Sequence, residues 1–420
     1  MPAGTSKTQA RGTDRGPAAR PAARAERGAI LVQVAVMMLA LTALSAFIVD
    51  AGILWTARRQ IQNTADAAAM AAAISLAFDA PGDQARARAN ALTAVAQNRV
   101  WDDVATVGDA DITFPACPTG SLGNGTCVRV EAFRNRTSPN PVPTVFAQLV
   151  GVLHQGVRAT ATAQVLFGTG SECVRPIAIP DRWAEFHNPA GPPGWDPTDT
   201  FERYAPSGAL LPSPDVYTPP VGNGANGTGY SLGPSGFTSG DYGAQARFAP
   251  QQFLNQPVGN EQFVPVRITP GASGPADMLT DMTSCAPRVV QPGDVLEVEP
   301  ADAYTPTFHG VSTLMSQDPA AFWDHRMNDR RGGVSGGCMS TGACTVSPRI
   351  VPIVAFDPDR WNAQPPGPQS AVVTRLVGAF IEGYEAPYVR ARLMGYPAAP
   401  STSMTADPQS SFVISVALVR

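Results

Sequence analysis

The sequence predicts an α+β protein in which an N-terminal transmembrane helix continues into a long helix that carries a small α+β head. A mostly β domain, rich in Pro and Gly, follows. Residues 28–49 contain no charged side chain, residues 50–168 mix helical and strand-like patterns, and the remainder alternates strand-like runs with Pro- and Gly-rich stretches. We divide the chain accordingly into 1–27, 28–49, 50–168 and 171–420.

The apolar segment from Gly28 to Val49 is long enough to cross a membrane. As a helix its 22 residues span about 33 Å, and a bilayer core is about 30 Å thick. Asp50 follows and is expected to mark the membrane exit. A signal peptide cleaved within 43–46 is the alternative. The run is longer than a usual signal-peptide core, and the helical pattern continues beyond it, which favours a retained single-pass anchor.

Charge is unevenly distributed around this anchor. Residues 1–27 carry a net charge of +4 and show no periodicity, which predicts a disordered basic tail, and the rest of the chain carries −8. The positive-inside rule places the tail in the cytoplasm, although Arg58 and Arg59 lie on the other side. The tail has no aromatic residue to stack on bases, so we expect attraction to anionic lipid and no nucleic-acid partner.

All six cysteines follow the apolar segment, and an even number in an exported domain favours disulfides. Proximity suggests that Cys117 pairs with Cys127 and Cys338 with Cys344, which leaves Cys173 and Cys285. Six reduced core thiols are the alternative. A zinc site is not expected, because no CxxC or HxxxH spacing is present.

Residues 28–78 are expected to form one helix, whose second half bears a stripe of mainly small residues. Small side chains let another backbone approach closely, so the stripe is a candidate seam for a partner helix, and packing on the protein's own head is the alternative. Gln62 and Asp66 lie four residues apart and could share a hydrogen bond. Asp66 could also pair with a basic residue of a partner. The stripe consists of Leu54, Ala57, Ile61, Ala65, Ala68, Ala72 and Leu76.

The remaining elements follow from periodicity and turn signals. Further helices are expected at 83–98, 144–153 and 312–330. Strands are expected at 111–114, 127–133, 156–167, 263–268, 288–299, 349–356, 372–383, 388–394 and 411–419. Residues 189–260, rich in Pro, Gly and Asn with scattered aromatics, read as a long loop. The second domain should therefore be a β-sandwich or β-barrel.

No motif with catalytic context emerges. Residues 333–337 match GxSxG and residues 222–227 match GxGxxG, but neither follows the apolar strand that its motif requires. His325 near Asp318 or Asp324 has no nucleophile or metal partner at hand. The acidic residues between 277 and 299 lack EF-hand spacing. We therefore expect no catalytic residue, no metal and no cofactor.

One ordered run of residues resembles a known family. The run consists of Asp50, Gly52, the Leu54-Trp55 pair, residues 58–60, the Gln62-Asn63 pair and residues 65–69, which include Asp66. In this order and spacing it resembles the N-terminal region of TadE/TadG-like proteins of the Tad (Flp) pilus system. The resemblance implies an inner-membrane protein that faces the periplasm, has a pilin-like helix and head, and works in the assembly or anchoring of a Tad pilus. We expect this role to be structural and not enzymatic. Its implied partners are pilin-like or other Tad assembly proteins.

Two departures limit what the resemblance implies. A prepilin peptidase site would have Glu at the fifth position after the cleavage glycine, and after Gly28 that position is Gln33. A processed pilin subunit is therefore not implied. No Asp-x-Ser-x-Ser stretch is present, so the metal site of longer relatives is not carried over.

Two other functions remain open at this point. The chain could be an anchored or secreted envelope enzyme with its site in the second domain, around Ser335 or His325. It could instead be a secreted binding module whose aromatic-containing loop at 189–260 holds a glycan or a protein partner.

Overall fold

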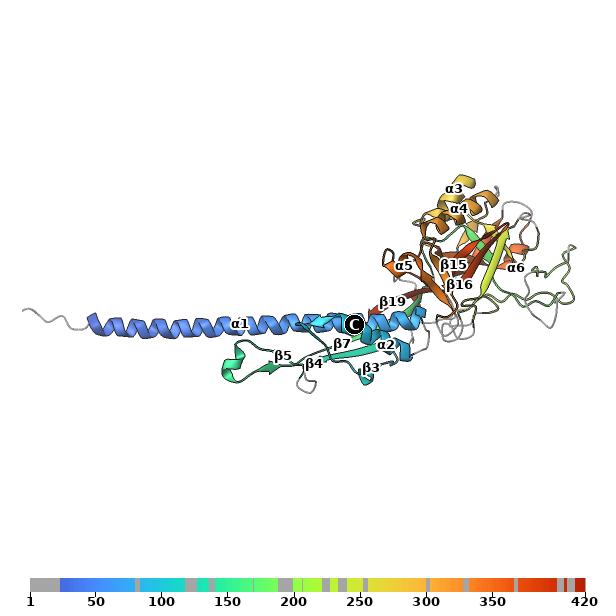
Figure 1. The fold of residues 1–420 in the computed structure, drawn as a ribbon. Helices are drawn as coiled ribbons and strands as arrows, with labels where there is room; N and C mark the ends of the chain where they lie inside the picture. Colours follow the sequence, from blue (N-terminus) through green and yellow to red (C-terminus); the bar gives the residue numbers. More distant parts are fainter. Residues whose placement is uncertain are drawn as a thin grey trace, which may run out of the picture.

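The computed structural model describes residues 23–79, 84–117, 127–135, 140–168, 170–187, 199–205, 207–220, 227–232, 240–251, 256–299, 303–327, 332–365, 369–398, 404–405 and 412–419. One long helix projects from the rest of the molecule, a small sheet packs along its second half, and a barrel lies at its far end (Figure 1). This α+β arrangement confirms the predicted fold class.

The long helix α1 (Ala23–Ile74) has 52 residues and is therefore about 78 Å long. It ends in a π-helical turn, η1 (Ser75–Asp79). Side chains from Ile30 to Val49 are exposed except for half-buried Ala46, whereas Ala-rich turns beyond Asp50 are buried on one face. Exposure thus divides the helix at the boundary that the charge pattern predicts.

A helix and a sheet form the head around the second half of α1. The helix is α2 (Gln84–Gln97), and the sheet order is β17-β19-β7-β4-β3, with β18 also paired to β7. The strands are β3 (Ile112–Thr113), β4 (Cys127–Arg134), β7 (Val157–Gly168), β17 (Tyr396–Pro397), β18 (Met404–Thr405) and β19 (Val413–Val419). Strand β7 alternates buried Ala159, Ala161 and Ala163 with less buried Arg158 and Thr160, as a half-buried strand should.

Short elements complete the head. They are β1 (Arg99–Val100), β2 (Asp103–Val104), η2 (Asp109–Asp111), β5 (Val142–Pro143), η3 (Ala147–Val150) and β6 (His154–Gln155). The expected helix at 144–153 is wrong, because this segment is a single 3₁₀ turn inside the β5–β6 hairpin. Gly151, at φ 84°, adopts the left-handed conformation that stops the turn.

The second unit is built on a closed β-barrel. Six strands form the ring: β8 (Ile177–Pro180), β9 (Gln245–Pro250), β10 (Gln262–Pro265), β14 (Ile350–Phe356), β15 (Ser370–Glu385) and β16 (Tyr388–Met394). The 16-residue β15 pairs with β14 along one stretch and with β16 along another, and β16 pairs with β9, so the ring has no free edge. A seventh strand, β11 (Val295–Glu297), lies outside the ring and pairs antiparallel with the first residues of β15.

Helices and a hairpin cover the barrel. They are α3 (Pro275–Thr283), α4 (Tyr304–Gln317), β12 (Ala321–Asp324), β13 (Gly333–Gly336), α5 (Gly337–Thr341) and α6 (Pro358–Asn362). The helix expected at 312–330 is displaced, because α4 begins at Tyr304 and ends at Gln317. Pro306 suits a first helical turn and Pro319 disfavours helix at the residue before it, which accounts for both ends.

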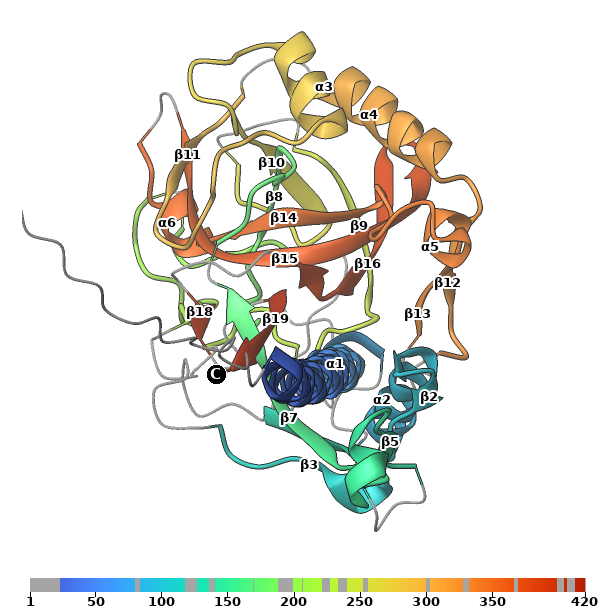
Figure 2. The same ribbon diagram turned by 90° about the vertical axis from the view of Figure 1, so that its left-hand side faces the viewer.

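The two units share a strand and a core. Strand β19 comes from the end of the chain but pairs with β7 from Thr162 to Gly168, so the last strand of the predicted region 171–420 belongs to the first sheet. Phe412 and Ile414 pack with Ala77 in the core that also fills the barrel. Seen along the axis of α1, the helix lies between the head sheet and the barrel (Figure 2). The far end of α1 is thereby fixed to both units.

Candidate functional site: the anchor helix and its junction with the head

The first half of α1 is the part of the described chain suited to a membrane. Among the described residues one helix is long and apolar enough to span a bilayer, and its most apolar 18-residue window is entirely unburied. Gly28 and Gln33 lie within this helix, and Gln33 is exposed. A helix that is apolar on all sides and unburied is suited to an apolar surrounding such as a bilayer.

Asp50 fixes the head to the helix where the apolar segment ends. Its buried carboxylate accepts hydrogen bonds from the backbone N–H groups of Val145, Phe146 and Ala147, with N···O distances of 2.8 Å for Val145 and 3.1 Å for Phe146. These amides open the η3 turn, whose N–H groups have no partner within the turn. Asp50 is therefore a clamp between α1 and the β5–β6 hairpin, a role that a boundary charge did not suggest from sequence.

The candidate partner seam is occupied by the chain itself. The five central members, from Ala57 to Ala72, are fully buried, and Leu54 and Leu76 are half-buried, in one core with β4, β7 and α2. Small residues face each other, since β7 presents Ala159, Ala161 and Ala163 toward this core. The seam assignment to a partner helix is therefore corrected: the stripe packs on the protein's own head because it supplies the head's core.

The other family-motif residues have separate positions. Gln62 Nε2 donates to Asp66 Oδ1 at 2.9 Å, as the four-residue spacing suggests, and also to the Thr160 carbonyl of β7 at 3.3 Å. Asn63 and Gly52 are exposed. Sequence reasoning missed Gln60, whose Oε1 accepts the Trp101 N–H at 2.7 Å. Two amide side chains thus tie α1 to the head.

The structure joins the cysteines in three disulfides. Cys117 pairs with Cys127, Cys173 with Cys285 and Cys338 with Cys344. The first lies in the head at the start of β4. The second spans 112 residues and links the chain just after β7 to the segment that follows α3. All three pairs agree with the prediction from sequence, in which two pairs follow from proximity and the third from the two cysteines that remain.

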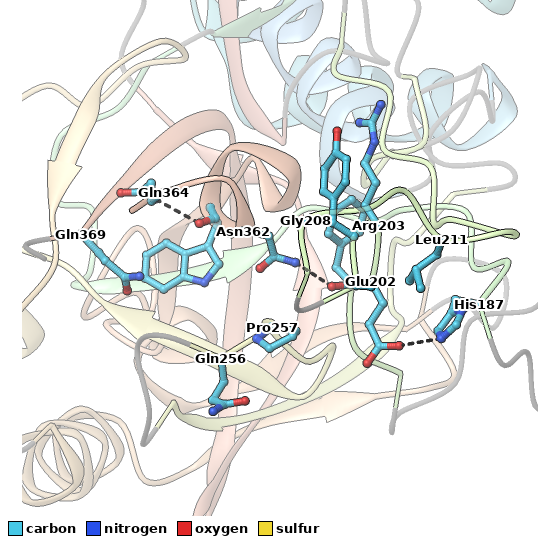
Figure 3. A pocket seen from close by; sticks show the side chains of 14 residues that line it. His187, Glu202, Arg203, Gly208, Leu211, Gln256, Pro257, Asn362, Gln364 and Gln369 are labelled. Carbon is cyan, nitrogen blue, oxygen red and sulfur yellow. Dashed lines mark hydrogen bonds and ion pairs between the residues drawn. The ribbon is translucent and has the colours of Figure 1, made fainter. Parts of the chain in front are cut away.

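A large polar cavity lies in the second unit, beside Trp361 and Asn362 of α6 (Figure 3). Its volume is about 890 Å³, and its wall includes residues 201–205, 208, 211, 256–257, 361–362, 364 and 369. His187 Nε2 lies 3.1 Å from Glu202 Oε2, and Asn362 Nδ2 donates to the Phe201 carbonyl at 2.6 Å, so both sides are held together. Two residues before His187 in the sequence, Glu185 is buried and accepts a hydrogen bond from Trp183 Nε1 at 2.9 Å. Burial raises the Glu185 pKa to about 8, a shift that the Trp183 bond opposes and nearby Asp215 supports.

Several of the described aromatics of the 189–260 segment anchor it to the barrel. Phe201, Tyr217 and Tyr230 are buried, whereas Tyr204 is exposed. Tyr217 Oη and the Tyr230 N–H donate to Asp181, which is fully buried in an ion pair with Arg375 at 3.0 Å. The segment also contains strand β9, so it is not one long loop. Trp195 and Phe237 lie outside the described residues.

The motif matches have no catalytic arrangement in the described part of the chain. Ser335 lies within β13 opposite Phe322, and β13 leads directly into α5 at Gly337. The strand is short and Gly-rich, and its last three residues are only half-buried, so it is not the buried apolar strand that precedes a nucleophile elbow. Asp318 is buried and accepts from Ser347 Oγ and the Cys338 N–H. The GxGxxG match lies outside the described residues except for Gly227. No group of three His, Cys, Asp or Glu side chains able to hold a metal ion occurs among the residues that the structure describes.

Comparison with known proteins bears on the helix. Residues 28–75 match the family model described as "Putative Flp pilus-assembly TadE/G-like". This segment is TadE/G-like. The match begins at the apolar half of α1 and ends at the close of its buried half, so the TadE/G-like segment includes both the Asp50 clamp and the buried stripe. No curated protein and no solved structure matches the chain. The TadE/G-like segment supports a role in pilus assembly.

Proposed function

We propose that this protein is a single-pass inner-membrane component of Tad (Flp) pilus assembly, with a cytoplasmic N-terminus and its bulk in the periplasm. Its role is structural, in assembly or anchoring, and not enzymatic. The observation that carries the proposal is the family match at 28–75, which coincides with a helix whose first half is exposed and apolar and whose second half is buried in a head. Its partners are the membrane and pilin-like or other Tad assembly proteins.

The arrangement suits an anchored spacer. The apolar half of α1 holds the chain in the bilayer, and the buried half, tied by Asp50, Gln60 and Gln62, makes helix and head one body. Strand β19 follows the barrel strands in the sequence and pairs with β7 of the head sheet. This pairing holds the second unit beyond the end of α1. Three disulfides suit an oxidising compartment outside the cytoplasm. Binding surfaces for assembly partners are then carried by the outside of the head and by the second unit.

A complementation experiment tests this proposal. A strain lacking the chain is supplied with the wild type or with Leu39→Arg/Leu41→Arg, since each arginine at the centre of a spanning helix costs about 2.5–3.5 kcal/mol of insertion. We expect loss of surface pili with the double variant. Leu210→Arg, at an exposed leucine of the second unit, is the matched control and should restore pili. Normal piliation without the chain would reject the assembly role.

A binding module is the second candidate, because the cavity of about 890 Å³ is large enough for a small polar ligand. Its wall offers Glu202, Arg203 and exposed Tyr204. Soluble envelope glycan fragments should then raise the unfolding temperature of the full chain, and Glu202→Ala should remove that rise. Glu261→Ala, at a carboxylate paired with Arg247 away from the cavity, is the control. No shift with any fragment would leave the assembly role as the sole candidate.

A further inference from the structure

The β5–β6 hairpin carries an exposed apolar surface, which we call the hairpin tip and define as residues 144–153. The side chains of Val145, Leu149 and Leu153 are 53%, 85% and 53% exposed, and Phe146 is also exposed. No Asp, Glu, Lys or Arg occurs anywhere from residue 140 to residue 157. An exposed apolar surface of this kind on a protein marks contact with a membrane or another protein.

The hairpin tip lies at the depth of the apolar half of α1. A groove of about 880 Å³ runs between them, and its wall includes Ala43, Ala46 and Phe47 of the helix together with Phe146 and Leu149 of the tip. The segment from Ala43 to Val49 covers about 10 Å along the helix axis. The tip therefore extends back past Asp50, alongside the last turns of the segment assigned to the bilayer, as Figure 1 shows for β5 beside α1.

Asp50 holds the tip in this position. Its carboxylate binds the three amides that begin the tip, so the depth of Leu149 relative to the helix is set by hydrogen bonds. Each of these N–H groups already has the Asp50 carboxylate as its acceptor. The clamp therefore reduces the free energy needed to move the amides from water toward an apolar medium.

The residues just beyond Asp50 have the composition of a membrane interface. Trp55 is exposed, and the Arg59 guanidinium carbon lies 3.9 Å from the centre of its ring. Arg58 is also exposed and contributes to the wall of the groove. Tryptophan and arginine at this level are typical of the headgroup region, where they contact lipid phosphates.

We infer that the hairpin tip inserts into the leaflet next to the head, as a second membrane contact, with phospholipid acyl chains occupying the groove. This inference rests on the proposed anchoring of residues 28–49. Lipid is favoured as the occupant because the groove opens beside a helix whose exposed face is itself apolar, so the two surfaces are continuous. Two contacts on one rigid body fix the tilt and rotation of α1, which a single helix leaves free.

The test uses the full-length protein in vesicles of phosphatidylcholine and phosphatidylglycerol that contain a phosphatidylcholine with a diazirine on its acyl chain. After illumination, peptide mass mapping locates the labelled residues. We expect label on 28–49 and on 144–153. Leu149→Glu should reduce label on the tip by about tenfold, because a carboxylate is costly in the apolar layer, while label on 28–49 is unchanged. Leu210→Glu, at an exposed leucine far from the membrane, should leave both signals unchanged.

The outcomes separate this inference from the proposed function. Label on 28–49 without label on the tip would overturn the inference and leave the anchor intact, whereas absence of label on 28–49 would overturn both. Cross-linking of the tip to a second copy of the chain, in place of lipid, would also overturn the inference. Tip label that Leu149→Glu does not reduce would show that the exposed leucine is not the contact.

Discussion

At the scale of single residues, Asp50 shows how one side chain can serve two purposes. From the sequence it is the charge that ends an apolar segment. In the structure it is also buried and binds three backbone amides of the β5–β6 hairpin. That second role could not be predicted, because its partners lie about a hundred residues away and the hairpin was expected to be a helix.

Replacing Asp50 by Asn tests the clamp. The amide retains one acceptor oxygen but loses the charge and one of the two oxygens that share the three N–H donors. We expect hydrogen exchange at Val145, Phe146 and Ala147 to accelerate by about fivefold to tenfold, the usual effect of losing a cap. Asp66→Asn, whose partner is Gln62 on the same helix, is the control and should leave these amides unchanged.

Glu185 gives a prediction for pH. Its pKa is raised from 4.5 to about 8 in the folded protein, so between these values the folded state holds a proton that the unfolded state has released. The free energy of unfolding should therefore fall as pH rises from about 4.5 to 8, and the loss should level off above that range. Glu185→Gln, which stays neutral, should remove this part of the decline. The measurement is chemical denaturation across pH, with Glu297→Gln as the control for loss of one negative charge. A difference between wild type and Glu185→Gln that does not grow across that range would contradict the assignment.

At the scale of elements, the alanine stripe decides how closely α1 approaches its sheet. Ala65 is fully buried beside β7, and the facing strand also presents alanines. The stripe was visible in the sequence, but periodicity alone does not say whether a helix packs on its own domain or on a partner. The structure resolves that choice because β7 and β4 supply a matching small-residue surface.

Ala65→Leu should overpack this contact and lower the free energy of unfolding by about 1–3 kcal/mol. Thr56→Leu adds a leucine to an exposed position of the same helix and should have little effect. Denaturation of the full chain in detergent compares the two. Equal stability of Ala65→Leu and the wild type would mean that the helix is not held as closely as the structure shows.

The elements that sequence predicts well are the ones fixed locally. The helix at 28–78 and the strands at 127–133, 156–167 and 388–394 follow periodicity that depends on nearby residues. The closure of the barrel and the return of β19 to β7 depend on pairings between distant segments, which no local pattern encodes. The 3₁₀ turn at the hairpin tip was missed because an apolar run with one glycine resembles a short helix.

At the scale of the whole molecule, long-range links make two units into one body. Strand β19, which follows the barrel strands in the chain, pairs with β7 of the head sheet, and Ala77 shares a core with Phe412 and the barrel. Within the second unit, the Cys173–Cys285 disulfide closes the longest loop among the three. The barrel keeps a fixed position relative to the long helix only if these links hold.

The disulfides should differ in their contributions to stability. Loop-closure entropy predicts a loss of about 4–5 kcal/mol for Cys173→Ser/Cys285→Ser, and about 2 kcal/mol for Cys338→Ser/Cys344→Ser, because the first loop spans 112 residues and the second spans 6. Chemical denaturation of the full chain, followed by tryptophan fluorescence, measures both losses. The reverse order would show that native contacts near the shorter bridge outweigh chain entropy.

The central claim is that residues 28–49 span the inner membrane and present the head on the far side from the basic tail. Protease treatment of sealed vesicles with the cytoplasmic face outward tests it most directly, in a full chain with an epitope before residue 28. We predict that the epitope is removed while a fragment from the anchor to the last strand stays intact until detergent is added. Digestion of the head with protection of the epitope, or release of the intact chain from the membrane at alkaline pH, would contradict the account.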